Sequence, residues 1–180
     1  YRHIEDIGPF CACLATGKEF CLRAYLDIET DRRGNICVIG LLVENNSFLQ
    51  WYGDGISPET IERELSNVKT IVTFNGDLFD LPQMKKCLNI DLQSNFISRD
   101  LFKDKKKLGI KGGLKQLEKM FGIERKTEGV NGYQAMWLWE KYKRHGNREA
   151  LKLLLEYNKE DVVNLTRLEE IIDQLGGGAL

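Results

Sequence analysis

The sequence has few histidines, no Cys-x-x-Cys pair and no long apolar run, and each shortage excludes a class of protein. His3 and His145 stand far from every acidic motif, so the chain offers no histidine-rich zinc site. No stretch approaches the roughly 20 consecutive apolar residues that cross a bilayer, and no signal sequence opens the chain. We therefore expect a cytoplasmic protein that has no membrane partner.

Five cysteines form an odd set without the spacing of a disulfide framework. They stand at Cys11, Cys13, Cys21, Cys37 and Cys87. Free thiols in a reducing cytoplasm are the simplest interpretation. A metal or iron–sulfur site built from the first three is the alternative, although their spacing matches no common ligand pattern.

Length and charge indicate one globular domain with two electrostatic halves. At 180 residues and 42% hydrophobic content, the chain can bury one well-packed core but not two. We expect a single domain over residues 21–176, preceded by an arm or hairpin of unknown role over residues 1–20. Residues 1–90 are net acidic and residues 91–155 are net basic, so one half suits cations and the other suits phosphates.

Hydrophobic periodicity and turn residues predict a mixed α/β sheet. Short apolar runs separated by tight turns predict three antiparallel strands, at residues 22–28, 36–43 and 47–51. Helices and strands then alternate: a helix from Pro58 to about Asn67 with Ser57 as its N-cap, a strand at 70–74, a helix at 78–88 and a strand at 95–99. Three helices follow, at 113–121, 132–143 and 147–175, the last broken or bent near Tyr157. The expected fold is a five-stranded sheet, three strands antiparallel and two parallel, with helices on both faces.

Two carboxylates, Asp27 and Glu29, lie within the first apolar strand. Alternate residues of a strand point to opposite faces, so both project from the same side of the sheet. Like charges at this spacing repel each other unless solvent or a cation separates them. A divalent metal ion would stabilise the pair; the alternative is the solvated polar end of a strand.

Two further motifs carry carboxylates that can reach this pair. Asp80 follows the strand at 70–74, which we expect to lie beside the first strand, although a carboxylate here also suits a helix N-terminus. Tyr157 and Asp161 stand at i and i+4, on one face of a helix, where an ordinary amphipathic helix is the alternative.

Together, Asp27-x-Glu29, Asn75-x3-Phe79-Asp80 and Tyr157-x3-Asp161 resemble the three motifs of the DEDDy 3'-5' exonucleases. This group of the ribonuclease-H-like superfamily includes the exonuclease domains of family B DNA polymerases. Residues 99–168 are still more similar to YprB-type ribonuclease-H-like domains, in particular Gly113 to Glu118 and Leu154 to Val163. The resemblance covers about residues 22–175 and implies a ribonuclease-H-like fold.

The resemblance also implies a two-metal mechanism with Mg²⁺ or Mn²⁺, because two hard cations stabilise the attacking and leaving oxygens of a phosphodiester. By resemblance, Asp27 bridges both metals, Glu29 and Asp161 hold the metal that carries the nucleophilic water, and Asp80 serves the second. Tyr157 orients that water or helps to deprotonate it. The implied activity is 3'-5' hydrolysis of single-stranded DNA or RNA.

Substrate contacts are expected on both sides of this site. Thr30 and Asn75 follow the motif residues, and a lysine-rich connection around Gly109 could neutralise phosphates, unless it is only a solvated surface. Its candidates are Lys103, Lys105, Lys106, Lys107 and Lys111. Less favoured basic candidates are Arg125, Lys126, Lys141, Lys143, Arg144 and Arg148. Five aromatic residues suit core packing better than base stacking: Trp51, Tyr52, Tyr133, Trp137 and Trp139.

Two alternatives to an exonuclease stay open. A structure-selective endonuclease could use the same chemistry, because the reaction does not itself require a chain end. A nucleic-acid-binding module could keep the fold without activity, although four gathered carboxylates argue against it. The sequence does not distinguish DNA from RNA.

Overall fold

A mixed five-stranded sheet forms the centre of the computed structural model, which describes residues 22–177. The strands are β1 (Leu22–Thr30), β2 (Ile36–Val43), β3 (Phe48–Tyr52), β4 (Val68–Thr73) and β5 (Ile97–Asp100). Their order in the sheet is β3-β2-β1-β4-β5, with the first three antiparallel and β4 and β5 parallel to β1. This confirms the predicted sheet; the arm predicted over residues 1–20 lies outside the described residues.

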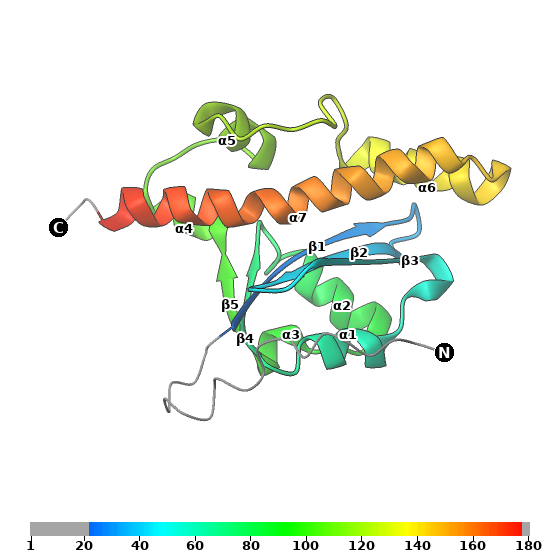
Figure 1. Ribbon diagram of the computed structural model, residues 1–180, viewed down its shortest axis with the longest axis horizontal. Coiled ribbons are helices and arrows are strands. Elements are labelled where there is room, and N and C mark those ends of the chain that lie inside the picture. Colours follow the sequence, from blue (N-terminus) through cyan, green and yellow to red (C-terminus); the bar gives the residue numbers. More distant parts are fainter. Residues whose placement is uncertain (1–21, 178–180) are drawn as a thin grey trace, which may run out of the picture.

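Helices cover both faces of the sheet, as predicted. They are the 3-10 turn η1 (Gly53–Gly55) and the helices α1 (Pro58–Glu64), α2 (Asp80–Leu88), α3 (Leu92–Asn95), α4 (Leu101–Lys107), α5 (Leu114–Phe121), α6 (Gly132–His145) and α7 (Arg148–Gly177). Figure 1 shows α1, α2 and α3 below the sheet, and α7 running across the opposite face with α6 beside its first turns.

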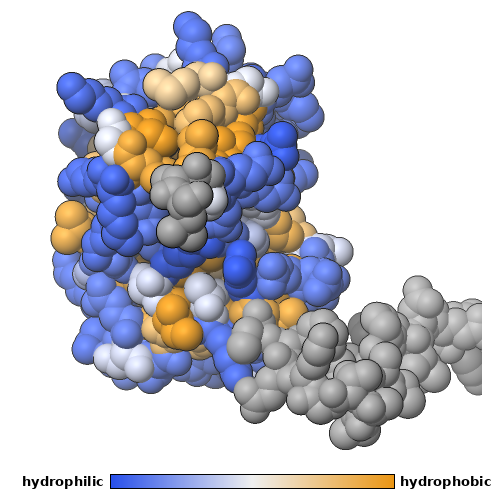
Figure 2. Space-filling model, turned by 90° about the vertical axis from the view of Figure 1, so that its left-hand side faces the viewer, coloured by the Kyte–Doolittle hydropathy of each residue, from blue (hydrophilic) through white to orange (hydrophobic). Residues whose placement is uncertain are grey.

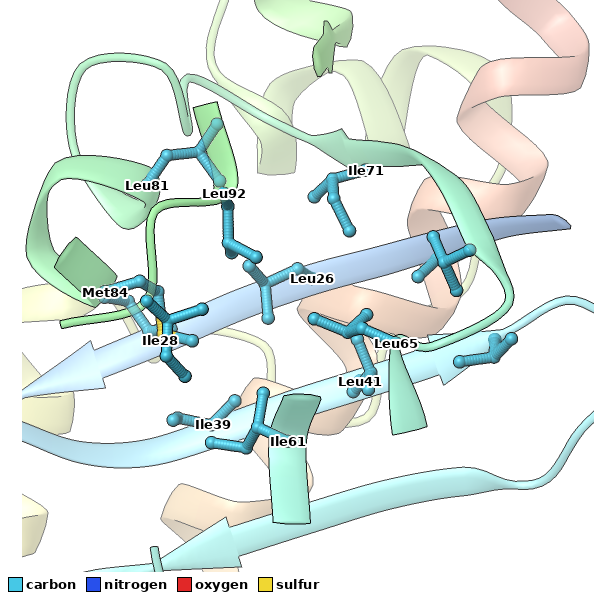
Figure 3. Close-up of a cluster of buried hydrophobic side chains, with 14 residues drawn as sticks. Leu26, Ile28, Ile39, Leu41, Ile61, Leu65, Ile71, Leu81, Met84 and Leu92 are labelled. Atoms are coloured by element: carbon cyan, nitrogen blue, oxygen red, sulfur yellow. The ribbon is translucent and has the colours of Figure 1, made fainter. Parts of the chain in front are cut away.

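The alternation of β1 side chains decides what each face of the sheet holds. Ala24, Leu26 and Ile28 point toward α1 and α2 and join the largest buried cluster, drawn in Figure 3. The intervening residues, including Asp27 and Glu29, therefore point toward α7. One face of β1 therefore packs in the apolar core, and the other face carries the two carboxylates.

A second apolar cluster holds α7 on the sheet. Val162, Leu165, Leu168 and Ile172 recur at helical spacing and pack against β1 and β4 residues. The helix runs without interruption for 30 residues. The break predicted near Tyr157 does not occur. Residues 148–175 contain no glycine or proline that would interrupt the helix, and Tyr157 itself is buried.

The lysine-rich connection contains a helix that the sequence analysis missed. Asp100 ends β5 and caps α4, accepting a hydrogen bond from the Phe102 backbone N–H at 3.0 Å. Lysine is a good helix former, so a capped run of lysines folds locally as a helix. The glycines form the turns beyond it, where Gly109 and Gly112 take φ values of 72° and 110°.

Surface and sequence features away from the sheet are ordinary. Within residues 22–177, no helix combines the length and apolar character that crossing a membrane requires. Cys37 and Cys87 are free thiols, as expected, and the other three cysteines lie outside the described residues.

Figure 2 shows an apolar patch at the end of the molecule where α7 finishes, opposite to α6.

Candidate active site

The carboxylates of Asp27 and Glu29 come together with that of Asp161 on α7. One carboxylate oxygen of each residue lies within 4.8 Å of the other two. Glu29 and Asp161 are buried, and Asp27 is half-buried. Two motifs that are far apart in the chain therefore form one group, which we call the acidic cluster.

The lack of a side chain at Gly40 allows α7 to lie this close to the sheet. Gly40 pairs with Asp27 across β1 and β2. A Cβ atom on Gly40 would lie 2.5 Å from Asn158 Oδ1 and 2.8 Å from Val162 Cγ2, so one side would have to move. A larger residue here would push α7, and Asp161 with it, away from β1.

Asn158, next to the predicted Tyr157, fixes the position of Asp27. Its Nδ2 donates to the Asp27 backbone oxygen at 3.1 Å and to Asp27 Oδ2 at 2.8 Å. Gln50 Nε2 in turn donates to Asn158 Oδ1 at 2.7 Å and holds the amide in this orientation. The Asp27 carboxylate is thus positioned by two elements besides its own strand.

Asp80 joins the site from the start of α2. Its Oδ1 accepts a hydrogen bond from the backbone N–H of Ile28 at 3.0 Å, which places the carboxylate beside the strand segment between Asp27 and Glu29. Burial raises the pKa of Asp80 to about 7, and the charges of Asp100 and Asp161 add to the shift. Asp80 is the first residue of α2 and does not cap it by a side-chain hydrogen bond; its carboxylate is hydrogen-bonded to β1 instead.

The acidic cluster is electrostatically unfavourable without added positive charge. Burial, together with the nearby charge of Asp161, raises the pKa values of both Asp27 and Glu29 well above the ordinary range. Burial also raises the pKa of Asp161, against the opposing effect of Arg125. Each carboxylate therefore favours a proton or a cation as a partner.

Tyr157 lies one helical turn before Asp161 and is hydrogen-bonded to it. Lys115 Nζ donates to the Tyr157 hydroxyl at 2.9 Å and also contacts the backbone oxygen of Val130. Burial and the charge of Asp161 raise the pKa of Tyr157. The phenol consequently keeps its proton at neutral pH and acts as a hydrogen-bond donor.

Arg125 connects the cluster to a buried carboxylate on α5. Its Nε and Nη2 each donate to Glu118 at 2.9 Å, and Nη2 also contacts Asp161 Oδ1. The Arg125 side chain is 6% exposed. Burial alone would lower the pKa of Arg125, but the hydrogen bonds to Glu118 and the charge of Asp161 raise it, so the guanidinium stays charged.

The site opens to solvent through a cleft beside the start of α5. Its volume is about 250 Å³, and its lining residues are Gly113, Leu114, Lys115, Gln116, Tyr157 and Asp161. Thr30 ends β1 directly after Glu29, and Asn75 lies on the loop before Asp80 with a φ of 65°. Both predicted contacts are therefore close in sequence to the residues that form the site.

The predicted lysines have different environments. Lys105 is buried and donates to the Gly112 oxygen at 2.6 Å, so it braces the turn after α4 and is poorly placed for a phosphate. Lys106 is exposed beside the Phe102 ring, and Lys107 pairs with Asp104 at 2.9 Å. Lys111 is exposed near the cleft residue Gly113.

The donor chemistry of the acidic cluster fits a hard divalent cation. All its side-chain donors are carboxylate oxygens, the atoms that Mg²⁺ and Mn²⁺ prefer. Burial and the neighbouring carboxylates raise the pKa values of Asp27 and Glu29, and a cation bound here would offset the cost of ionising them. The residues Asp27, Glu29 and Asp161 therefore suit a metal ion, with Asp80 beside them.

Comparison with known proteins shows the family of the chain and a solved structure with a similar fold. A family model described as RNase H superfamily matches residues 24–172. The chain belongs to the RNase H superfamily. The family B DNA polymerase from the hyperthermophilic archaeon Pyrobaculum calidifontis has a similar fold, with a TM-score of 0.61 and 12% sequence identity over 82% of this chain. This chain spans only 24% of that polymerase. No curated protein matches the sequence.

Several residues of the candidate site in this RNase H superfamily chain were missed by sequence reasoning. Asn158 and Lys115 lie inside stretches that carry the family resemblance, but nothing in their spacing marks a role. Arg125 was only a weak phosphate candidate, and Glu118 was not considered. Burial of opposite charges, which would have identified the last pair, is not visible in a sequence.

Proposed function

We propose that this protein is a metal-dependent 3'-5' exonuclease of the DEDDy type that hydrolyses single-stranded nucleic acid. The observation that carries the proposal is the acidic cluster, in which Asp27, Glu29 and Asp161 converge within 4.8 Å beside a cleft. Burying three carboxylates together is unfavourable for folding, and a divalent cation offsets this cost. We assign the exonuclease domain to residues 21–176 of a cytoplasmic protein.

Asp27, Glu29 and Asp161 would hold one cation, and Asp27 with Asp80 would hold the other. When bound, the two cations would activate a water molecule and neutralise charge on the phosphodiester. Hydrogen bonds from Asn158, itself held by Gln50, keep Asp27 oriented. A hydrogen bond from the Ile28 backbone N–H keeps Asp80 oriented. Preorganised ligands need little rearrangement during the reaction.

Tyr157 would orient the attacking water by hydrogen bonding rather than take its proton. Its raised pKa favours the neutral phenol, which is a poor base. Lys115, which donates to Tyr157, brings positive charge to the cleft, where a phosphate would lie. Thr30, Asn75, Lys106, Lys107 and Lys111 are the proposed contacts along the strand.

The test is cleavage of 5'-labelled single-stranded DNA and RNA of one sequence, with Mg²⁺, Mn²⁺ or EDTA. We expect a ladder that shortens from the 3' end, requires metal and is absent in Asp27→Ala. The matched control is Asp173→Asn, which removes a carboxylate of α7 that pairs with Arg99 far along the helix. This control should cleave like the parent.

Other outcomes would replace the proposal. Internal cuts would indicate a structure-selective endonuclease. Binding of both strands without cleavage in any metal would indicate a nucleic-acid-binding module. Equal cleavage by Asp27→Ala would contradict the assigned site.

A further inference from the structure

Two aromatic side chains on α6 are exposed, unlike most aromatic residues in the part of the chain that the structure describes. Tyr133 and Trp137 are 64% and 39% exposed, whereas Trp139 on the same helix is 5% exposed and packs in the core. Tyr133 and Trp137 stand at i and i+4, so they share one face of α6. Their ring centroids lie 6.2 Å apart with an interplanar angle of 74°. Core packing, the role expected from the sequence, therefore does not account for this pair.

Basic side chains stand beside Trp137. The Arg32 guanidinium lies 4.6 Å from the Trp137 ring centroid. Arg33 follows in the same turn, and Lys141 is one helical turn after Trp137; both are exposed. We call Arg32, Tyr133 and Trp137 the α6 platform. Exposed aromatic rings beside arginine and lysine are complementary to a strand of bases and phosphates.

The α6 platform lies close to the acidic cluster. Arg32 stands three residues after Glu29, in the turn that joins β1 to β2. At the other side, Lys115 contacts both Tyr157 and the backbone oxygen of Val130, and α6 begins two residues later with Asn131 as its N-cap. Figure 1 agrees, since β1 points toward the side of the molecule where α6 lies.

We propose that the α6 platform stacks nucleobases of the single strand as it leads away from the acidic cluster. The inference rests on the proposed exonuclease function and adds a binding site to it. Stacking uses the faces of the bases, so the platform would accept any sequence. Arg33 and Lys141 would pair with the phosphates between stacked bases. A protein partner of ordinary composition would match this combination of aromatic and basic side chains less well.

The first measurement is the affinity for a 5'-fluorescent single strand of about 12 nucleotides in EDTA, followed by anisotropy. Trp137→Ala should weaken binding roughly 5- to 50-fold, because one stacked base is lost. Tyr133→Ala should weaken it in the same direction, while Trp137→Phe should retain most of the affinity. Thermal melting shows whether each variant folds. If Trp137→Ala does not fold, the test is made with Tyr133→Ala.

Tyr52→Ala is the matched control. Tyr52 is 40% exposed and also has an aromatic neighbour, Tyr142, but it lies on β3 and outside the platform. Its loss should leave affinity unchanged. The second measurement is cleavage of a dinucleotide in Mn²⁺, which is too short to reach the platform and should be cut equally by the parent and by Trp137→Ala.

The outcomes separate this inference from the proposed function. If the parent binds and cleaves the strand but Trp137→Ala and Tyr133→Ala bind it equally well, the platform is overturned and the exonuclease stands. Weakening by Tyr52→Ala to the same degree would also overturn the platform, because the effect would not be local. A parent that neither binds nor cleaves any strand overturns both.

Discussion

At the scale of single residues, Arg125 neutralises two carboxylates at once. It donates to Glu118, which is 2% exposed, and contacts Asp161 in the acidic cluster. A buried charge that loses its partner is strongly unfavourable, whereas the intact group is balanced. Arg125 thus stabilises the fold and stands in for part of the positive charge that a metal would bring.

Replacing Arg125 tests this dual role. Arg125→Met should destabilise the metal-free protein by roughly 3–5 kcal/mol, because Glu118 is left buried and unpaired. Denaturant unfolding measures the change. The double variant Arg125→Met, Glu118→Gln should recover part of the loss, since the unpaired charge is removed. Equal stability of parent and Arg125→Met would show that the ion pair does not matter.

Asp80 makes the stability of the metal-free protein depend on pH. Its pKa is about 7 in the folded protein and close to 4 when unfolded, so the folded state binds the proton more tightly. The stability that Asp80 contributes by binding this proton is therefore fully present below about pH 4. It is lost as the pH rises through about 7. Asp80→Asn keeps an acceptor for Ile28 but cannot titrate.

The expected result is a melting temperature in EDTA that falls more steeply between pH 5.5 and pH 8 in the parent than in Asp80→Asn. The difference should reach roughly 5 °C or more for a protein of this size. Mn²⁺ should restore much of the loss at pH 8, because cations favour the ionised carboxylates. Identical slopes for the two proteins would contradict the assigned pKa.

At the scale of elements, the site depends on the closeness of β1, β2 and α7. At Gly40 on β2, the side chains of Asn158 and Val162 from α7 lie directly against the backbone of the sheet. The second apolar cluster holds the helix on the sheet beyond this point, and a third cluster, in which Leu154 and Tyr157 pack with Val38, holds it before this point. The geometry of the candidate site is thus a property of packing as much as of the carboxylates themselves.

Gly40→Ala should disturb that packing. The added methyl group would displace α7, destabilise the fold by roughly 1–3 kcal/mol and weaken Mn²⁺ binding, because Asp161 would move from Asp27. Calorimetric metal titration and thermal melting measure both effects. Gly55→Ala is the matched control, since no atom lies within 4 Å of its Cβ position. Unchanged metal affinity in Gly40→Ala would show that α7 need not lie so close.

The elements also show what the sequence could predict. Strand alternation was enough to place Asp27 and Glu29 on one face, and helical spacing was enough to pair Tyr157 with Asp161. Both rules are local. The segment after α5 follows no such rule: Glu160 on α7 accepts hydrogen bonds from the Lys126 and Thr127 backbone N–H groups, and these long-range contacts place Arg125. No periodicity in the sequence predicts these contacts.

At the scale of the whole molecule, the fold gathers residues from most of its length. The carboxylates come from β1, from the start of α2 and from α7, and the described chain places them at one end of β1. The superfamily and the sheet order were predictable because the three motifs follow one another in a fixed order and each lies in the expected strand or helix. The buried state of Lys105 and the exposed state of Trp137 were not, since each depends on how distant helices pack.

The most direct test of the account is calorimetric titration of the purified protein with Mn²⁺. We expect the parent to bind the metal and Asp27→Asn to lose most of that binding, because Asp27 lies in the acidic cluster and beside Asp80. Asp173→Asn should bind like the parent. If Asp27→Asn binds Mn²⁺ with the affinity and stoichiometry of the parent, the acidic cluster is not a metal site, and the exonuclease mechanism proposed for it is wrong.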